Sequence, residues 1–290
     1  MSSIVQVASA RATSSEPPGS VRNHILFLAA LWVVALLPFL LWRGTWFGRP
    51  LSDQQIGEYL HDNTNPTHVQ HALTQLADRM QRRDESAVSW YPDVVRLASF
   101  PVEDVRATAA ISMGFDPSRA DFHDALRVAL KDPSPAVRAN AAVALANFGD
   151  ASGHDELILM LQPSFVVTHE PAHVVDVVNA GASVKQLGSV AHLRIGTYAY
   201  TVRAPIAGKV AKVNVKADKD IAAGTQIAVL EPSADEQLEA LRALYAVGEP
   251  EDLPMIEGMA NSPDAPEKVR QQASLTDRSI RDRASTKGLF

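Results

Sequence analysis

Hydrophobic positions follow three different spacings along this chain. Residues 25–42 form an apolar run of eighteen residues without a charge. Over residues 51–162 and 233–284, apolar positions recur at helical intervals. Residues 163–232 alternate apolar and polar positions between Gly and Pro turns, which predicts short strands. The pattern therefore predicts an α+β protein in which an all-β segment is inserted between helical segments, with a short tail over 285–290.

The apolar run predicts a transmembrane helix over residues 24–42, long enough at 1.5 Å per residue to cross a hydrocarbon layer of roughly 30 Å. Trp42 and Trp46 then stand where aromatic side chains border the headgroups. A cleaved signal peptide is the alternative, but small residues would follow its shorter apolar core. We expect an uncleaved single-span anchor between a disordered tail, 1–23, and a juxtamembrane segment, 43–50.

The orientation of this anchor is not fixed by charge. Arg11 and Arg22 precede the apolar run, and Arg43 and Arg49 follow it. The rule that basic residues stay on the cytoplasmic side therefore gives a tie, and both orientations stay open at this point.

A short motif repeats within the helical segments. The pair Val-Arg stands at positions 105–106 and 137–138, an offset of 32 residues, and two alanines follow each copy at the same distance. A weaker third copy has Val-Arg at 269–270, shortly after an Asp and a Pro. Small alanines let helices approach closely, and stacked helix pairs can bury a continuous core. The repetition predicts a row of similar helical units.

These residues resemble HEAT-like repeats over about residues 86–162 and 234–284. The resemblance implies paired helices that form a surface for protein partners. It also implies a structural role, bonding between repeats, for Arg106, Arg138 and Arg270.

The alternating segment resembles the biotinyl/lipoyl-type barrel. The residues that carry the resemblance are Ala204, Pro205, Gly208, Val210, Val213, Val215, Ile221, Gly224, Ile227 and Leu230. The resemblance implies a small all-β barrel over residues 163–232, inserted between the helical segments.

Carrier members of that family attach biotin or lipoate to a lysine at a hairpin tip. In this chain Thr197, beside Gly196, occupies the corresponding place, and a hydroxyl cannot form the required amide. Lys209 and Lys212 fall in the following turn and strand. We therefore expect an unmodified barrel without a cofactor; the alternative, a cofactor carrier, predicts an increased mass of the intact protein.

A second candidate chemistry lies in the letters His169-Glu170-x-x-His173, the pattern of a zinc hydrolase with Glu170 as general base. The pattern requires a helix, on which residues four apart share a face. Pro171 and the surrounding valines favour a strand, where the two imidazoles would lie about 13 Å apart. We expect no metal site, and the zinc hydrolase remains the alternative of a different class.

Composition narrows the remaining functions. The net charge of −6 gives no reason to expect nucleic acid, and the absence of cysteine excludes disulfides and thiolate sites. No nucleophile elbow, phosphate loop or dinucleotide fingerprint is present in the sequence. We therefore expect a protein that is not an enzyme.

Together these features predict a membrane-anchored, non-enzymatic scaffold subunit that binds protein partners, in a bacterial membrane or transport complex. Membrane-fusion adaptors of bacterial exporters also combine an unmodified barrel with one N-terminal span, so an exporter adaptor is a further alternative. That resemblance implies a single-pass protein of the cell membrane with an extracytoplasmic soluble part. The long helical hairpin of those adaptors has no room between Val174 and Glu231.

Overall fold

The structure is a computed structural model that describes residues 50–287. Helices occupy both ends of this part of the chain, and eight strands lie between them. The helical elements are α2 (Asp53–Leu60), α3 (Pro66–Gln81), η2 (Glu85–Trp90), α4 (Tyr91–Leu97), α5 (Glu103–Met113), α6 (Ala120–Ala129), α7 (Pro135–Asn147), η3 (Ala151–Gly153), α8 (His154–Met160), α9 (Ala234–Val247), η4 (Pro250–Asp252), α10 (Leu253–Asn261) and α11 (Glu267–Lys287). The strands are β1 (Ser164–Val167), β2 (Ala172–Val177), β3 (Ser183–Val184), β4 (Ser189–Ile195), β5 (Tyr198–Arg203), β6 (Gly208–Val213), β7 (Lys219–Ile221) and β8 (Gln226–Pro232).

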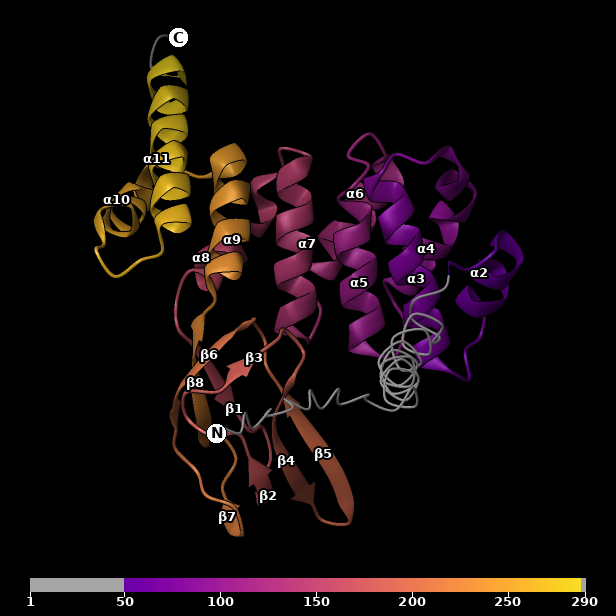
Figure 1. Cartoon of the computed structure of the whole chain (residues 1–290), viewed down its shortest axis with the longest axis vertical. Helices are drawn as coiled ribbons and strands as arrows, with labels where there is room; N and C mark the ends of the chain where they lie inside the picture. Colours follow the sequence, from indigo (N-terminus) through magenta and orange to yellow (C-terminus); the bar gives the residue numbers. More distant parts are fainter. Residues whose placement is uncertain (1–49, 288–290) are drawn as a thin grey trace, which may run out of the picture. The chain divides into compact units, whose positions relative to one another are not determined.

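The helices between residues 51 and 287 pack as five hairpins: α2/α3, α4/α5, α6/α7, α8/α9 and α10/α11. The second helices of the hairpins, α3, α5, α7, α9 and α11, lie side by side in one row (Figure 1). Each hairpin therefore buries its apolar side on the hairpin before it, which is the packing of a helical-repeat protein.

Side-chain caps determine where several of these helices begin. Ser52 and Gln55 form a reciprocal capping box at the start of α2. Asn65 caps α3, and Pro66 occupies the first helical position, where a backbone N–H has no helical partner. Ser233 caps α9 by accepting a hydrogen bond from the Glu236 N–H.

Helix α7 is buried on two sides, which explains its alanine-rich sequence. Val137 and Leu145 belong to the core shared with the preceding helices, whereas Ala142 and Ala146 belong to the core shared with the following ones. The contacts are close: a Cβ added at Gly153 would lie 2.5 Å from the Cβ of Ala142. A helix that is apolar all round is a central helix, and α7 joins the two halves of the row.

The strands are inserted between α8 and α9, the two helices of one hairpin. They form two antiparallel sheets of four strands, with the orders β1-β8-β6-β3 and β5-β4-β2-β7. The first strand pairs with the last, with Ser164 opposite Leu230 and Phe165 opposite Val229. The chain therefore leaves the sheets beside the place where it entered them, and α8 can still pack against α9.

The two sheets share one apolar core, to which both contribute. Its buried residues are Val166, Ala172, Val174, Val190, Ala191, Leu193, Val202, Ala204, Ile206, Val210, Ile227, Ala228 and Leu230. The predicted small all-β barrel is wrong: the strands form two four-stranded sheets, in which β1, β3, β5 and β7 each have a neighbouring strand on one side only. A barrel continues its hydrogen bonds around the whole circumference, whereas these two sheets are held together by side chains.

Several contacts join the sheets to the helices. Nε of Arg203 on β5 lies 3.4 Å from Oε1 of Glu103, at the first turn of α5. Leu187, between β3 and β4, packs against the helical core. The Ala207 N–H donates a 3.2 Å hydrogen bond to Oε2 of Glu236 at the first turn of α9.

The prediction of an integral, single-span membrane protein is corrected. Across residues 50–287, no helix combines the length and the apolar character that a bilayer span requires. The longest of these helices, α11, reaches 21 residues but is rich in charged side chains, which hydrocarbon would leave unsolvated. Residues 24–42, on which the prediction rested, lie outside the described residues. The membrane partner and the cell-membrane location are withdrawn with it.

Candidate protein-docking site

Arg106 connects two consecutive helical hairpins. Its Nε and Nη2 donate to the two carboxylate oxygens of Asp132 at 2.7 and 2.9 Å, and its Nη1 donates to the carbonyls of Phe100 and Pro101. Burial opposes ionisation of Asp132, but hydrogen bonds from Arg106 and from the Ser134 N–H hold the pKa of Asp132 below its usual value. The pair is largely buried, so Arg106 is committed to the packing of the repeats.

The equivalent arginine of the next repeat makes equivalent contacts. Nε of Arg138 donates to Oε1 of Glu156 on α8 at 2.6 Å, and its Nη1 donates to the Asp132 carbonyl at 3.0 Å. Arg270, on the last helix, donates to the Ala265 carbonyl at 3.1 Å. Within residues 50–287 no ion pair is found for Arg270.

We call Arg106 and Arg138, with their acidic partners Asp132 and Glu156, the Arg ladder. An open groove lies beside it, between α4 and α6, and we call it the α4–α6 groove. Its volume is about 870 Å³. It is lined by Val95, Ala98, Ser99, Arg106, Ala125, Arg127, Val128, Ala129, Leu130, Lys131, Asp132 and Ser152. Val128 is 73% exposed, although the neighbouring Leu126 and Ala129 are buried in the core.

Two cations at this groove have no carboxylate of their own. Arg106 and Asp132 neutralise each other, but Arg127 and Lys131 make no ion pair with any residue of the described range 50–287. An apolar floor with unpaired cations at its side suits a segment that presents apolar and acidic side chains together. The groove therefore presents apolar surface and unpaired positive charge side by side.

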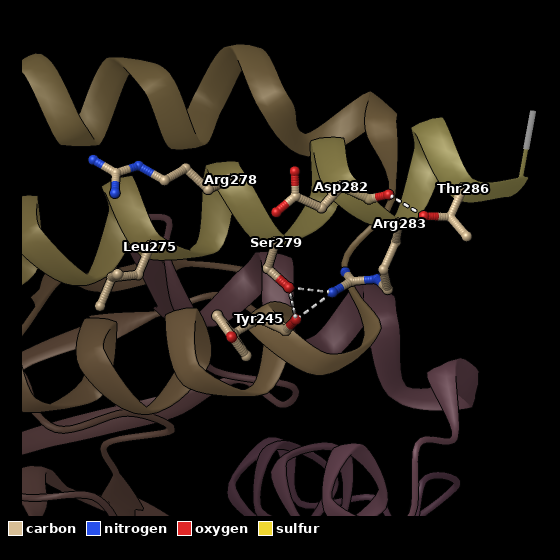
Figure 2. Close-up of a pocket in the computed structure, with 7 residues that line it drawn as sticks. All are labelled: Tyr245, Leu275, Arg278, Ser279, Asp282, Arg283 and Thr286. Carbon is tan, nitrogen blue, oxygen red and sulfur yellow. Dashed lines mark hydrogen bonds between the residues drawn. The ribbon is translucent and has the colours of Figure 1, made fainter.

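The last two helices of the row form a second groove of about 560 Å³, lined by Tyr245, Leu275, Arg278, Ser279, Asp282, Arg283 and Thr286. Figure 2 shows that Ser279 and Arg283 converge on the backbone of Tyr245. Arg283 also donates to the carbonyl of Gly248 at 2.8 Å, so it satisfies the free carbonyls at the end of α9. The polar groups that converge here complete the end of a helix, so the α4–α6 groove is the better docking candidate.

The structure does not assemble the zinc pattern. His169 and Glu170 lie in the connection between β1 and β2, and His173 lies on strand β2. Nδ1 of His173 is 2.8 Å from Oδ1 of Asp220 on the neighbouring β7. Within residues 50–287 no group of three or more side chains has the arrangement of a metal site. The zinc-hydrolase pattern needs a helix interior at the position of Pro171, and a proline disfavours one, which explains why these residues form no helix here.

Thr197, the residue at the predicted acceptor position, lies in the connection between β4 and β5. Gly196 and Thr197 form this two-residue turn, with Gly196 at a φ of 60°, and both are exposed. The hairpin tip is therefore found at the expected residues, although the sheets that carry it do not form the expected barrel.

Sequence reasoning missed the residues of the α4–α6 groove. The signal was present: the stretch Ala125–Ala129 contains four apolar residues and one arginine, more than one face of a helix can bury. The excess apolar position is Val128, which lies outside the core. The available signal was therefore one apolar residue more than the buried face of this helix can hold.

A family model for HEAT repeats matches residues 96–169 of the chain. No curated protein matches it. The matched segment runs from the end of α4 past α8 and strand β1, so it contains most of the α4–α6 groove and both arginines of the Arg ladder, Arg106 and Arg138. The predicted HEAT-like repeats are confirmed for this segment.

Proposed function

We propose that this chain is a non-enzymatic scaffold that binds a protein partner in the α4–α6 groove. The observation that carries the proposal is the combination, within a confirmed HEAT-repeat segment, of an exposed Val128 with two unpaired cations, Arg127 and Lys131. HEAT repeats are consistent with a protein-interaction scaffold, and this groove is the part of the repeats best equipped to receive one.

The chemistry of the groove defines the class of partner. An extended or helical segment would place an apolar side chain against Val128 and the neighbouring alanines, which removes apolar area from water. Acidic side chains on either side of it would meet Arg127 and Lys131. Such exposed charges mainly increase the association rate, and salt screens them. Binding is therefore expected to weaken as the ionic strength rises.

Site-specific photocrosslinking tests the proposal. A photoreactive residue replaces Val128 in the full chain, expressed in its own host, and the crosslinked segments are sequenced by mass spectrometry. We expect segments that combine acidic and apolar residues, and we expect their loss when Arg127 and Lys131 are both changed to Glu. Basic segments, or crosslinks unaffected by this double change, would contradict the proposal.

Two matched controls separate the groove from the rest of the surface. Leu159 on α8 is 53% exposed and apolar, so a photoreactive residue there reports chance contacts. Arg278 on α11 makes no ion pair within residues 50–287, so Arg278→Glu reverses a comparable charge elsewhere. Identical crosslinks at positions 128 and 159 would contradict binding in the α4–α6 groove. An equal loss of crosslinked segments with Arg278→Glu would contradict it as well.

A further inference from the structure

The four edges of the two sheets are protected to different degrees. At one end of each sheet the edge strand is short: β3 has two residues, and β7 has three, including Lys219 and Asp220. At the other end β1 has four residues and β5 has six, and the sequence from Tyr198 to Val202 carries no charge and no proline. Proteins usually shorten or charge an exposed edge, because unpaired backbone groups recruit other strands. Two edges follow this practice, and β1 and β5 do not.

The two unprotected edges also carry exposed aromatic side chains. Tyr198 and Tyr200 on β5 are 77% and 51% exposed, and Phe165 on β1 is 63% exposed. Aromatic residues on a strand edge give a pairing strand large surfaces to pack against.

Both edges line one groove of about 440 Å³, which we call the edge-strand groove. Phe165, Val166 and Val167 come from β1, and the residues from Tyr200 to Arg203 come from β5. The helical side of the groove includes Glu103 of α5 and the start of α7, residues 133–135.

The start of α7 differs from the start of α5 on the same groove. Glu103 and Asp104 lie in the first turn of α5, whereas the first turn of α7 has no acidic residue. The N-cap residue of α7, Ser134, makes no side-chain capping bond. Ser134 is 6% exposed, its hydroxyl has no hydrogen-bond partner among residues 50–287, and it lines the groove. The carboxylate of Asp132 accepts a hydrogen bond from the Ser134 N–H but is held in the ion pair with Arg106, so no side-chain oxygen caps the first turn of α7.

We infer that the edge-strand groove binds an extended peptide of a partner protein by strand addition to β5, with a carboxylate of the peptide at the start of α7. The unpaired backbone of β5 supplies the hydrogen bonds, and the aromatic side chains supply the apolar contact. The carboxylate complements the uncapped helix end. It belongs to an Asp or Glu side chain or to the C-terminus of the peptide. Arg106 lines both this groove and the α4–α6 groove, but the strand edges and the start of α7 belong to the edge-strand groove alone, so the inference stands without the proposed function.

The register shows which backbone groups of β5 are available. Ile195 and Tyr198 flank a two-residue turn, so they exchange the hydrogen bonds of that turn. Because bonded and non-bonded pairs alternate in antiparallel strands, Tyr200 also bonds to β4, and Ala199 and Thr201 direct their N–H groups to the free edge. A proline at position 199 therefore removes a free donor without removing a bond to β4.

Fluorescence anisotropy with the full chain tests the inference. The probe is a labelled, C-terminally amidated octapeptide of alternating Val and Thr with one internal Glu. Two companions replace Glu by Gln, or carry Gln and a free C-terminal carboxylate, so they distinguish the two sources of charge. We expect saturable binding of at least one carboxylate peptide, and at least tenfold weaker binding of the neutral one.

Two variants locate the binding. Ala199→Pro is expected to weaken binding at least tenfold, while Ala199→Ser, which keeps the N–H, stays within twofold of the unmodified chain. Ser134→Asp gives α7 its own capping carboxylate and is expected to abolish the preference for the charged peptide without loss of stability. Thermal unfolding confirms that each variant is folded.

Several outcomes would overturn the inference. These are absence of saturable binding at millimolar peptide, undiminished binding by folded Ala199→Pro, and a preference for the charged peptide that survives Ser134→Asp. Sedimentation of the unmodified chain alone provides the last test. A dimer that Ala199→Pro dissociates would show that a second copy, and not a partner peptide, occupies the edge.

Discussion

The helical repeats and the inserted sheets obtain their stability in different ways. In the repeats, most buried faces lie between consecutive hairpins, and α7 contributes to two cores at once. The sheets share a single core of their own, and a few contacts, including those of Arg203 and Glu236, join them to the helices. A repeat therefore depends on its neighbours, whereas the sheets depend on themselves. The difference predicts that a destabilising substitution in one helical repeat also destabilises its neighbours, whereas one in the sheets destabilises the sheets alone.

The largest effect is expected at the Arg ladder. Arg106→Ala leaves the buried Asp132 without its partner, which should destabilise the repeats by about 3–5 kcal/mol. Arg270→Ala is the matched control, because it removes carbonyl bonds but no ion pair within residues 50–287, and it should cost about 1 kcal/mol. Urea unfolding followed by far-ultraviolet circular dichroism measures both. Equal losses would show that the ion pair contributes nothing beyond the carbonyl bonds.

The next effect tests whether the sheets are independent. Leu193 is fully buried in the sheet core, so Leu193→Ala should destabilise the sheets by about 3 kcal/mol. Hydrogen exchange should accelerate in β2, β4 and β8 and stay unchanged in α3 and α5. Acceleration in α3 and α5 of the same size would show that the two regions unfold as one unit.

A smaller effect tests the close packing around α7. Gly153→Ala brings a Cβ to 2.6 Å from the Cα of Ala142, so backbone must move, and we expect a loss of about 2 kcal/mol. Gly258→Ala on α10 is the control, since nothing lies within 4 Å of the added Cβ and a helix interior favours alanine by about 1 kcal/mol. Melting temperatures should therefore shift in opposite directions. A shift of the same sign in both variants would argue against close packing as the cause.

The smallest effect lies at the joint between the two regions. Burial raises the pKa of Glu236 to about 7, from an ordinary value of 4.5, so the folded state favours the protonated carboxyl. The stability that the protonated Glu236 carboxyl gives the folded state is fully present below about pH 4.5, and it is lost as the pH rises through 7. Glu236→Gln mimics the neutral form and keeps an acceptor for the Ala207 N–H. It should match the unmodified chain at pH 4.5 and exceed its stability at pH 8 by about 1–2 kcal/mol.

Denaturant titrations at both pH values measure that difference. Asp235→Asn, an exposed position in the same first turn of α9, is the control for the general loss of a negative charge near the helix start. A gain of the same size from Asp235→Asn, or a gain from Glu236→Gln that does not change with pH, would exclude the titration of Glu236 as its cause.

The sequence was most informative where local chemistry repeats. Val105 and Val137 stand at the offset of 32 residues, and both are fully buried on neighbouring helices of the row. The alternation over residues 201–232 likewise predicted strands at β6 and β8. These features depend on neighbours in sequence, so periodicity alone was enough to predict them.

Long-range pairing was less predictable. The alternation of apolar and polar positions over residues 201–232 is the same in an open sheet and in a closed barrel, so it could not show that β1 and β5 end their sheets. The candidate site depends on which charges stay unpaired. Arg106 pairs with Asp132, 26 residues away, whereas Arg127 makes no ion pair in the described range. Spacing in the sequence does not distinguish the paired arginine from the unpaired one.

The insertion of the sheets between α8 and α9 also sets the order in which a nascent chain can mature. When the ribosome has released α8, residues 161–233 must still be synthesised before its hairpin partner appears. During that interval Leu157 and Met160 of α8, and the Ala142 side of α7, await the core that α9 completes. The pairing of β1 with β8 ends this interval, because it delivers α9 directly beside α8. We therefore expect translation to pass through an incomplete row of helices, in which the apolar side of α7 and α8 is exposed and available to chaperones.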